Sequence, residues 1–192
     1  MANSLMGNNH SKFRNIVNAS NSVAFGCSHT WGTGVEADET WAYCLKAMNF
    51  GVGACSADFV VRIAPDILNK YQPTTVYVLW PDWARFEYIK DNIYTQSLPT
   101  DKDRIYFMET HTEEWLKKNF QQQVGLMNQY CNDRNIKLID MSLYDLIPYI
   151  DHADQWPLSK LGHHYAPSWH KQVADIFHNA KINNIKHPIA NE

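Results

Sequence analysis

A serine stands at the end of a short apolar run near the start of the chain. The run Ser22–Phe25 is followed by a glycine, a cysteine and Ser28, a pattern typical of a buried strand that ends in a tight turn. A serine hydroxyl on such a turn can act as a nucleophile when a base lies beside it. A phosphate loop is not indicated, because no Lys follows the glycines at 32 and 34 in the required spacing. A turn without chemistry is the alternative.

Histidines gather in the last quarter of the chain, where His163, His164 and His170 follow Asp151 and Asp154. A neutral imidazole can take a proton from a serine, and a carboxylate can orient that imidazole. The same residue types are also zinc ligands. Their spacing is not that of a known zinc motif, and adjacent loop histidines are commonly exposed to solvent.

Two further candidate sites follow predicted strands. The segment Asn49–Ser56 is rich in glycine, and the segment Trp80–Glu87 contains Asp82 and Arg85. Sites in parallel α/β sheets form beyond the carboxyl ends of the strands. These segments are therefore expected near Ser28.

The four blocks, in this order, resemble those of the SGNH (GDSL-type) hydrolases, in a divergent branch of bacterial and phage proteins. The resemblance implies that Ser28 is the nucleophile of an ester hydrolase and His164 its general base. It further implies an oxyanion hole made by backbone N–H groups of Ser28 and of Gly53 or Ala54, with Asp82 at the position of a family asparagine.

Three positions depart from the family pattern. Ala54 replaces a glycine, which a backbone donor tolerates if its φ is negative. Asp82 replaces a hydrogen-bond donor, so it must be protonated, point elsewhere or be replaced by another donor. Leu161 occupies the position of the acid, so Asp154, Asp151 or a backbone carbonyl would have to orient His164, or the site works as a bare dyad.

The expected reaction is ester hydrolysis through an acyl-enzyme, without a cofactor, on a small-molecule or carbohydrate ester. His29, Trp31, Trp80 and Arg85 are candidates for the substrate cleft, although a lone loop histidine such as His29 is often merely exposed. The triplet Arg85–Glu87 resembles the same branch of the family, and a solvated Arg–Glu pair is its alternative interpretation.

Two other functions remain open. One is a non-catalytic domain that binds a small ligand, and the other is a metal-dependent hydrolase built on His163, His164 and His170.

The 192 residues, 45% of them hydrophobic, suffice for one domain with a sizeable core. We expect an extension over 1–21, one domain over 22–183 and a tail over 184–192. The net charge of -3, without long runs of like charge, predicts no nucleic-acid or membrane partner. The oligomeric state is not indicated.

Strands are expected at 22–25, 49–52, 75–80 and 136–140. Helices are expected from Trp41 through Met48, over 59–70, from a capping box at Thr110 and Glu113 to about 133, and over 168–180. A short helical turn is expected near 143–147. Residues 81–109 show little periodicity and are expected to cross the surface as a wall of the cleft.

Strands that alternate with helices predict an α/β fold, a three-layer α/β/α sandwich around a mostly parallel, flavodoxin-like sheet of about five strands. The four cysteines lack C-x-x-C spacing, so neither a zinc site nor a redox motif is expected. The absence of a signal-like or membrane-spanning segment, with free thiols, predicts a cytoplasmic protein.

Overall fold

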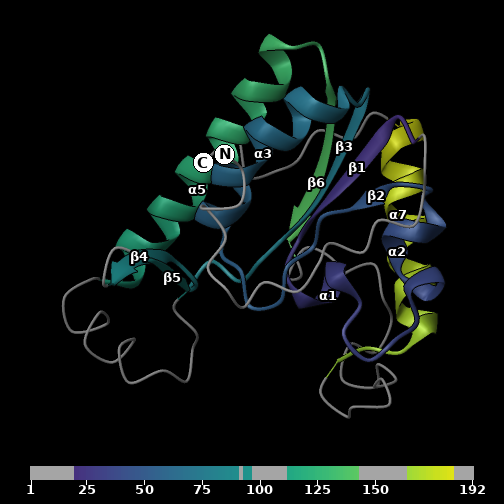
Figure 1. Ribbon diagram of the computed structural model, residues 1–192, viewed down its shortest axis with the longest axis horizontal. Helices are drawn as coiled ribbons and strands as arrows, with labels where there is room; N and C mark the ends of the chain where they lie inside the picture. Colours follow the sequence, from purple (N-terminus) through teal and green to yellow (C-terminus); the bar gives the residue numbers. More distant parts are fainter. Residues whose placement is uncertain (1–19, 91–92, 97–111, 143–163, 184–192) are drawn as a thin grey trace.

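A computed structural model describes residues 20–90, 93–96, 112–142 and 164–183. Its centre is a parallel sheet in the order β2-β1-β3-β6 (Figure 1). The strands are β1 (Ser22–Gly26), β2 (Met48–Asn49), β3 (Thr75–Trp80) and β6 (Lys137–Ser142). This is the beginning of the flavodoxin-like order, so the expected α/β fold class is confirmed.

Helices cover both faces of the sheet. Figure 1 shows α3 (Ala57–Tyr71) and α5 (Glu113–Asp133) on one face, with α2 (Trp41–Cys44) and α7 (Pro167–Asn183) on the other. Alternate strand residues point to opposite faces. Val76 and Val78 of β3 therefore pack in the cluster with α3 and α5, whereas Tyr77 and Leu79 pack with α2 and α7.

The helix that begins at Glu113 is capped by a residue other than the expected one. The hydroxyl of Thr112 accepts a hydrogen bond from the Trp115 N–H at 3.2 Å, whereas Thr110 lies outside the described residues. The expected buried face of Leu116, Phe120, Met127 and Cys131 is confirmed. The break after α3 is also confirmed, because Gln72 ends that helix in a left-handed conformation.

The expected helix through Met48 is wrong. Helix α2 ends at Cys44, and Lys46 then takes a positive φ of 54°. Met48 instead lies in β2, paired with Val23. The apolar residues that gave this segment its helical spacing belong to two elements: Trp41 of α2 packs in the cluster with α7, and Met48 of β2 packs in the cluster with α3 and α5.

The segment after β3 differs from the expected surface excursion. Ala84 and Phe86 are buried, and an antiparallel hairpin follows, formed by β4 (Glu87–Lys90) and β5 (Ile93–Gln96). Residues 97–109 and the helical turn expected near 143–147 lie outside the described residues. The beginning of this segment is therefore anchored in the core.

All four cysteines are free, and Cys44 is exposed whereas the other three are buried. Within the described part of the chain, no helix is long and apolar enough to cross a membrane.

Candidate active site

Ser28 lies immediately beyond the carboxyl end of β1. It is the first residue of a one-turn helix, α1 (Ser28–Trp31), whose N–H groups at Thr30 and Trp31 both bond to the Cys27 carbonyl at 3.0 and 2.9 Å. Gly26 makes this turn possible. Its φ is +148°, and a Cβ there would meet the Leu79 carbonyl oxygen at 2.4 Å. The sharp exit from β1 therefore requires glycine.

A buried amide fixes this turn to the next strand. Asn49 is 4% exposed. Its Nδ2 donates to the Thr30 carbonyl at 2.7 Å, and its Oδ1 accepts from the Gly51 N–H at 2.9 Å. The side chain thus joins α1 to the segment that carries Gly53. No motif marks Asn49 in the sequence, and only its burial between two loops reveals this role.

The candidate oxyanion segment forms a tight turn. The Cys55 N–H bonds to the Val52 carbonyl at 3.3 Å, with Gly53 and Ala54 between them. The φ of Ala54 is +63°, so the condition under which alanine would be tolerated, a negative φ, is not met. A left-handed conformation costs an L-residue about 1–2 kcal/mol. The turn keeps the conformation that favours glycine, although the residue is alanine.

His164 approaches the nucleophile turn from the C-terminal part of the chain. The ring centroids of His164 and His29, the residue after Ser28, are 5.3 Å apart. His29 also stacks on Tyr165 at 5.0 Å, and Tyr165 stacks on Trp169 at 4.6 Å. An aromatic cluster therefore joins α1 to the start of α7.

His29 is not the exposed loop histidine of the alternative reading. Burial, with additional effects of His164, Arg85 and His170, lowers its pKa to about 3. His29 is therefore neutral at physiological pH. Its buried Nδ1 has no hydrogen-bond partner among the residues that the structure describes.

His170 belongs to the core rather than to a site. It is 1% exposed, and its Nδ1 accepts a hydrogen bond from the Trp41 N–H at 3.4 Å. Burial and the nearby His164 lower its pKa to about 4. This geometry gives His170 the role of joining α2 to α7. Across the described ranges, no group of three His, Cys, Asp or Glu residues could hold a metal ion.

A small cavity of about 70 Å³ opens beside the nucleophile turn. Four expected cleft or oxyanion residues line it, and Ser28, Trp31, Gly53 and Ala54 do not. Cys27 and His29, which flank Ser28, both contribute to the wall. Its lining residues are Cys27, His29, Leu79, Trp80, Pro81, Asp82 and Arg85.

Two of the lining residues have local structural roles. Trp80 is 1% exposed and its indole N–H donates to Asp140 at 2.7 Å, so it forms part of the core as well as the wall. The Asp82 Oδ1 accepts from the Ala84 N–H at 2.8 Å. That carboxylate oxygen is turned back onto its own loop, as in an Asx turn.

Arg85 and Glu87 do not form the solvated pair of the alternative reading. Glu87 receives two hydrogen bonds from Arg62, at 2.8 and 2.6 Å, and its side chain is only 6% exposed. Arg85 faces the cavity instead. Its Nε and Nη1 are buried and have no hydrogen-bond partner in the described part of the chain.

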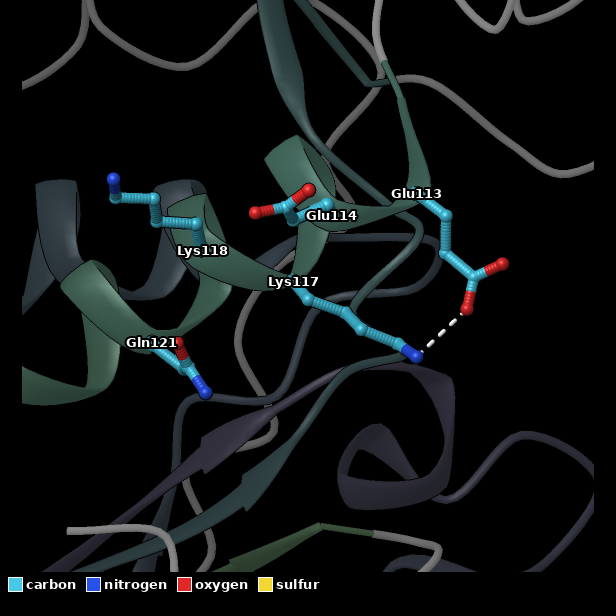
Figure 2. Close-up of a pocket in the computed structure, with 5 residues that line it drawn as sticks. All are labelled: Glu113, Glu114, Lys117, Lys118 and Gln121. Carbon is cyan, nitrogen blue, oxygen red and sulfur yellow. Dashed lines mark ion pairs between the residues drawn. The ribbon is translucent and has the colours of Figure 1, made fainter. Parts of the chain in front are cut away.

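Several predicted site residues lie outside the described part of the chain: Asp151, Asp154, Leu161 and His163. A second hollow, of about 560 Å³, lies elsewhere, along the start of α5. Figure 2 shows that its lining side chains all rise from this one helix, among them the exposed pair Glu113 and Lys117 at 2.7 Å. A hollow without opposing walls does not enclose a small ligand.

Comparisons with known proteins give similarity in structure only. No protein-family model matches the chain, and no curated protein matches it. A family 3 carbohydrate esterase from Clostridium thermocellum is 14% identical, with a TM-score of 0.47 over 85% of this chain and 95% of that one. The psychrotrophic esterase EstA from Pseudoalteromonas sp. is 12% identical, with a TM-score of 0.44 over 86% and 98%.

A protein assigned to the lipolytic G-D-S-L family, from Desulfitobacterium hafniense DCB-2, is 14% identical, with a TM-score of 0.43 over 82% of this chain and 96% of that one. These structural neighbours, two esterases and one protein of the G-D-S-L family, all resemble the chain at low sequence identity.

Proposed function

We propose that the chain is a serine-dependent ester hydrolase that acts through an acyl-enzyme on Ser28. The observation that carries the proposal is the meeting of two distant segments beside one cavity. The segment that begins at His164 packs on His29, next to Ser28, at the carboxyl end of the parallel sheet. This is the edge at which parallel α/β sheets form their sites.

In the proposed reaction, His164 takes the proton of the Ser28 hydroxyl as the oxygen attacks the ester carbonyl. The tetrahedral intermediate collapses to the acyl-enzyme when the alcohol leaves with that proton. Water, deprotonated by the same imidazole, then releases the acid. The N–H groups of Ser28 and of Gly53 or Ala54 are the proposed backbone donors to the oxyanion.

The cavity favours a short acyl group. Its volume of about 70 Å³ is well below the roughly 300–1,000 Å³ of ordinary ligand pockets. Such a cavity suits a small acyl group rather than a fatty acyl chain. We therefore propose acetyl esters, of small molecules or of carbohydrates, as the substrate class.

The test is a serine substitution with a covalent probe. Ser28→Ala removes only the nucleophilic oxygen, and we expect hydrolysis of nitrophenyl acetate to fall on the order of a thousandfold or more. A fluorophosphonate should add its mass to Ser28 in the unsubstituted protein and to no site in the variant. An equally active Ser28→Ala variant would refute the proposal.

One observation favours a second candidate, a domain that binds a small ligand without catalysis. The Asp82 carboxylate accepts a hydrogen bond where the resemblance implies a donor. If this candidate is correct, the unsubstituted protein will bind acetate or acetylated sugars but will neither hydrolyse esters nor react with fluorophosphonate.

The orientation of His164 is tested separately. We propose a bare Ser–His dyad, in which case Asp154→Asn and Asp151→Asn each change kcat/KM only slightly. If either aspartate orients the imidazole, its substitution should cost about a hundredfold or more. A large loss in one variant would identify the acid.

A further inference from the structure

The cavity beside Ser28 contains a positive charge that no described residue neutralises. Arg85 lines it, and Arg85 has no ion-pair partner among the described residues. Its Nε and Nη1 are buried without hydrogen bonds, as is the Nδ1 of His29 in the same wall. Three unsatisfied nitrogen atoms therefore belong to residues that line one small space.

This arrangement is unusual in a native protein. Buried polar atoms are paired in the great majority of cases, and a buried unpaired guanidinium is especially costly. Arg62 of the same chain is paired in the ordinary way, because its guanidinium donates hydrogen bonds to both carboxylate oxygens of Glu87. An unpaired group at a site is explained when a ligand supplies the missing partner.

The ligand must be an anion that offers oxygen atoms. Guanidinium N–H groups donate charge-assisted hydrogen bonds to the oxygens of a carboxylate or of a tetrahedral carbon that carries a negative charge. Among the described residues of the wall, the only carboxylate is that of Asp82, and its Oδ1 accepts a hydrogen bond from the Ala84 N–H. The remaining wall at Leu79, Trp80 and Pro81 is apolar, which strengthens a charge-assisted hydrogen bond.

We propose that Arg85 stabilises the oxyanion of the acyl carbon in place of the donor that Asp82 cannot supply, and binds the acid product through the same N–H groups. This inference rests on the proposed function. When Ser28 attacks, the carbonyl π electrons move to oxygen, and Arg85 donates hydrogen bonds to that O⁻. After hydrolysis, the carboxylate of the product accepts a hydrogen bond from the same guanidinium.

The first test measures turnover. Arg85→Met keeps the length of the side chain and removes its N–H groups. For nitrophenyl acetate we expect kcat to fall about 10²–10³-fold with KM changed only a few-fold, the effect of losing one oxyanion donor. Arg85→Ala should regain at least part of this kcat in guanidinium chloride kept far below denaturing concentrations, a rescue that a structural role would not give.

The control is Arg134→Met, the same chemical change at an exposed residue that caps α5 and lies against Tyr130. Its kcat should equal that of the unsubstituted protein. If Arg85→Met also keeps full kcat while Ser28→Ala loses it, the role of Arg85 is refuted and the proposed function stands.

The second test does not depend on catalysis. Acetate binding, followed by calorimetry, should be retained in Ser28→Ala and lost in Arg85→Met. Loss in Arg85→Met supports the anion site even if the esterase proposal fails. Equal acetate affinity in Arg85→Met and the unsubstituted protein refutes the anion site, whatever the activity measurements show.

Discussion

Two regions meet at the carboxyl end of the sheet, and they differ in whether their buried polar groups are hydrogen-bonded. In the corner formed by α1 and the segment after β2, Asn49 makes two buried hydrogen bonds to backbone groups. In the loop after β3, Arg85 leaves two buried nitrogen atoms without partners. In the first region the polar atoms fix the backbone, and in the second we propose that they bind a ligand.

The difference separates residues that stabilise the fold from residues that we propose bind a ligand. Satisfied buried groups stabilise one arrangement, whereas unsatisfied groups reduce stability unless something binds. We therefore expect substitutions in the corner to act first on folding, and substitutions of Arg85 to act on kcat and on acetate binding. The following predictions test the corner, from the largest expected effect to the smallest.

Gly51→Ala should have the largest effect. A Cβ at Gly51 would lie 2.3 Å from the Trp31 nitrogen and 2.7 Å from the Thr30 carbonyl carbon, so α1 would have to move. We expect a loss of about 4 kcal/mol or more in the free energy of unfolding, measured with urea. The matched control is Gly53→Ala, where a Cβ meets nothing within 4 Å, and we expect a change within about 0.5 kcal/mol. Equal stability of the two variants would contradict the close packing of the corner.

Asn49→Ala should cost about 2–4 kcal/mol, because it leaves the Gly51 N–H and the Thr30 carbonyl without their buried partner. Asn128→Ala is the control, since Asn128 makes a single part-buried bond to its own helix at Val124. Its cost should be about 1 kcal/mol or less. Comparable losses in the two variants would mean that Asn49 does not hold the corner together.

Acid should destabilise the protein through its buried histidines. The pKa of His170 is lowered from 6.5 to about 4, so between these values the unfolded chain binds more protons than the folded protein. Stability is therefore complete above pH 6.5 and is lost as pH falls toward 4. His170→Asn keeps an acceptor for the Trp41 N–H and should reduce the loss at pH 5 by about 2 kcal/mol.

The histidine prediction is checked by urea unfolding at a series of pH values. His29, whose pKa is lowered to about 3, should leave a residual pH dependence in the His170→Asn variant. An unchanged pH profile in that variant would show that His170 titrates normally in the folded protein.

Ala54→Gly should have the smallest effect and the opposite sign. Glycine accepts the φ of +63° without strain, although it gives up some entropy on folding. We expect a gain of about 0.5–1 kcal/mol, read from the urea midpoint at an unchanged m-value. A loss of stability would mean that the alanine methyl contributes packing that outweighs its strain.

Much of the fold could be predicted from the residues alone. The run Thr75–Trp80 and the helix from Glu113 to Asp133 follow their expected bounds closely, because both are long, strongly patterned and buried over a whole face. The prediction of a helix through Met48 was wrong because α2 and β2 are each too short to show a periodic hydrophobic pattern. The hairpin after Glu87 was missed because its strands are only four residues each.

The sequence by itself determined that a serine would stand on a sharp turn after β1, since Gly26 is the residue that such a turn requires. It also determined the largely apolar run of β3, which is buried on both faces. Only the tertiary structure decided which polar side chains are satisfied. Glu87 pairs with Arg62 rather than Arg85, and His170 bonds to Trp41. These partners are distant in sequence, and only the packing of the elements brings their atoms within hydrogen-bonding distance.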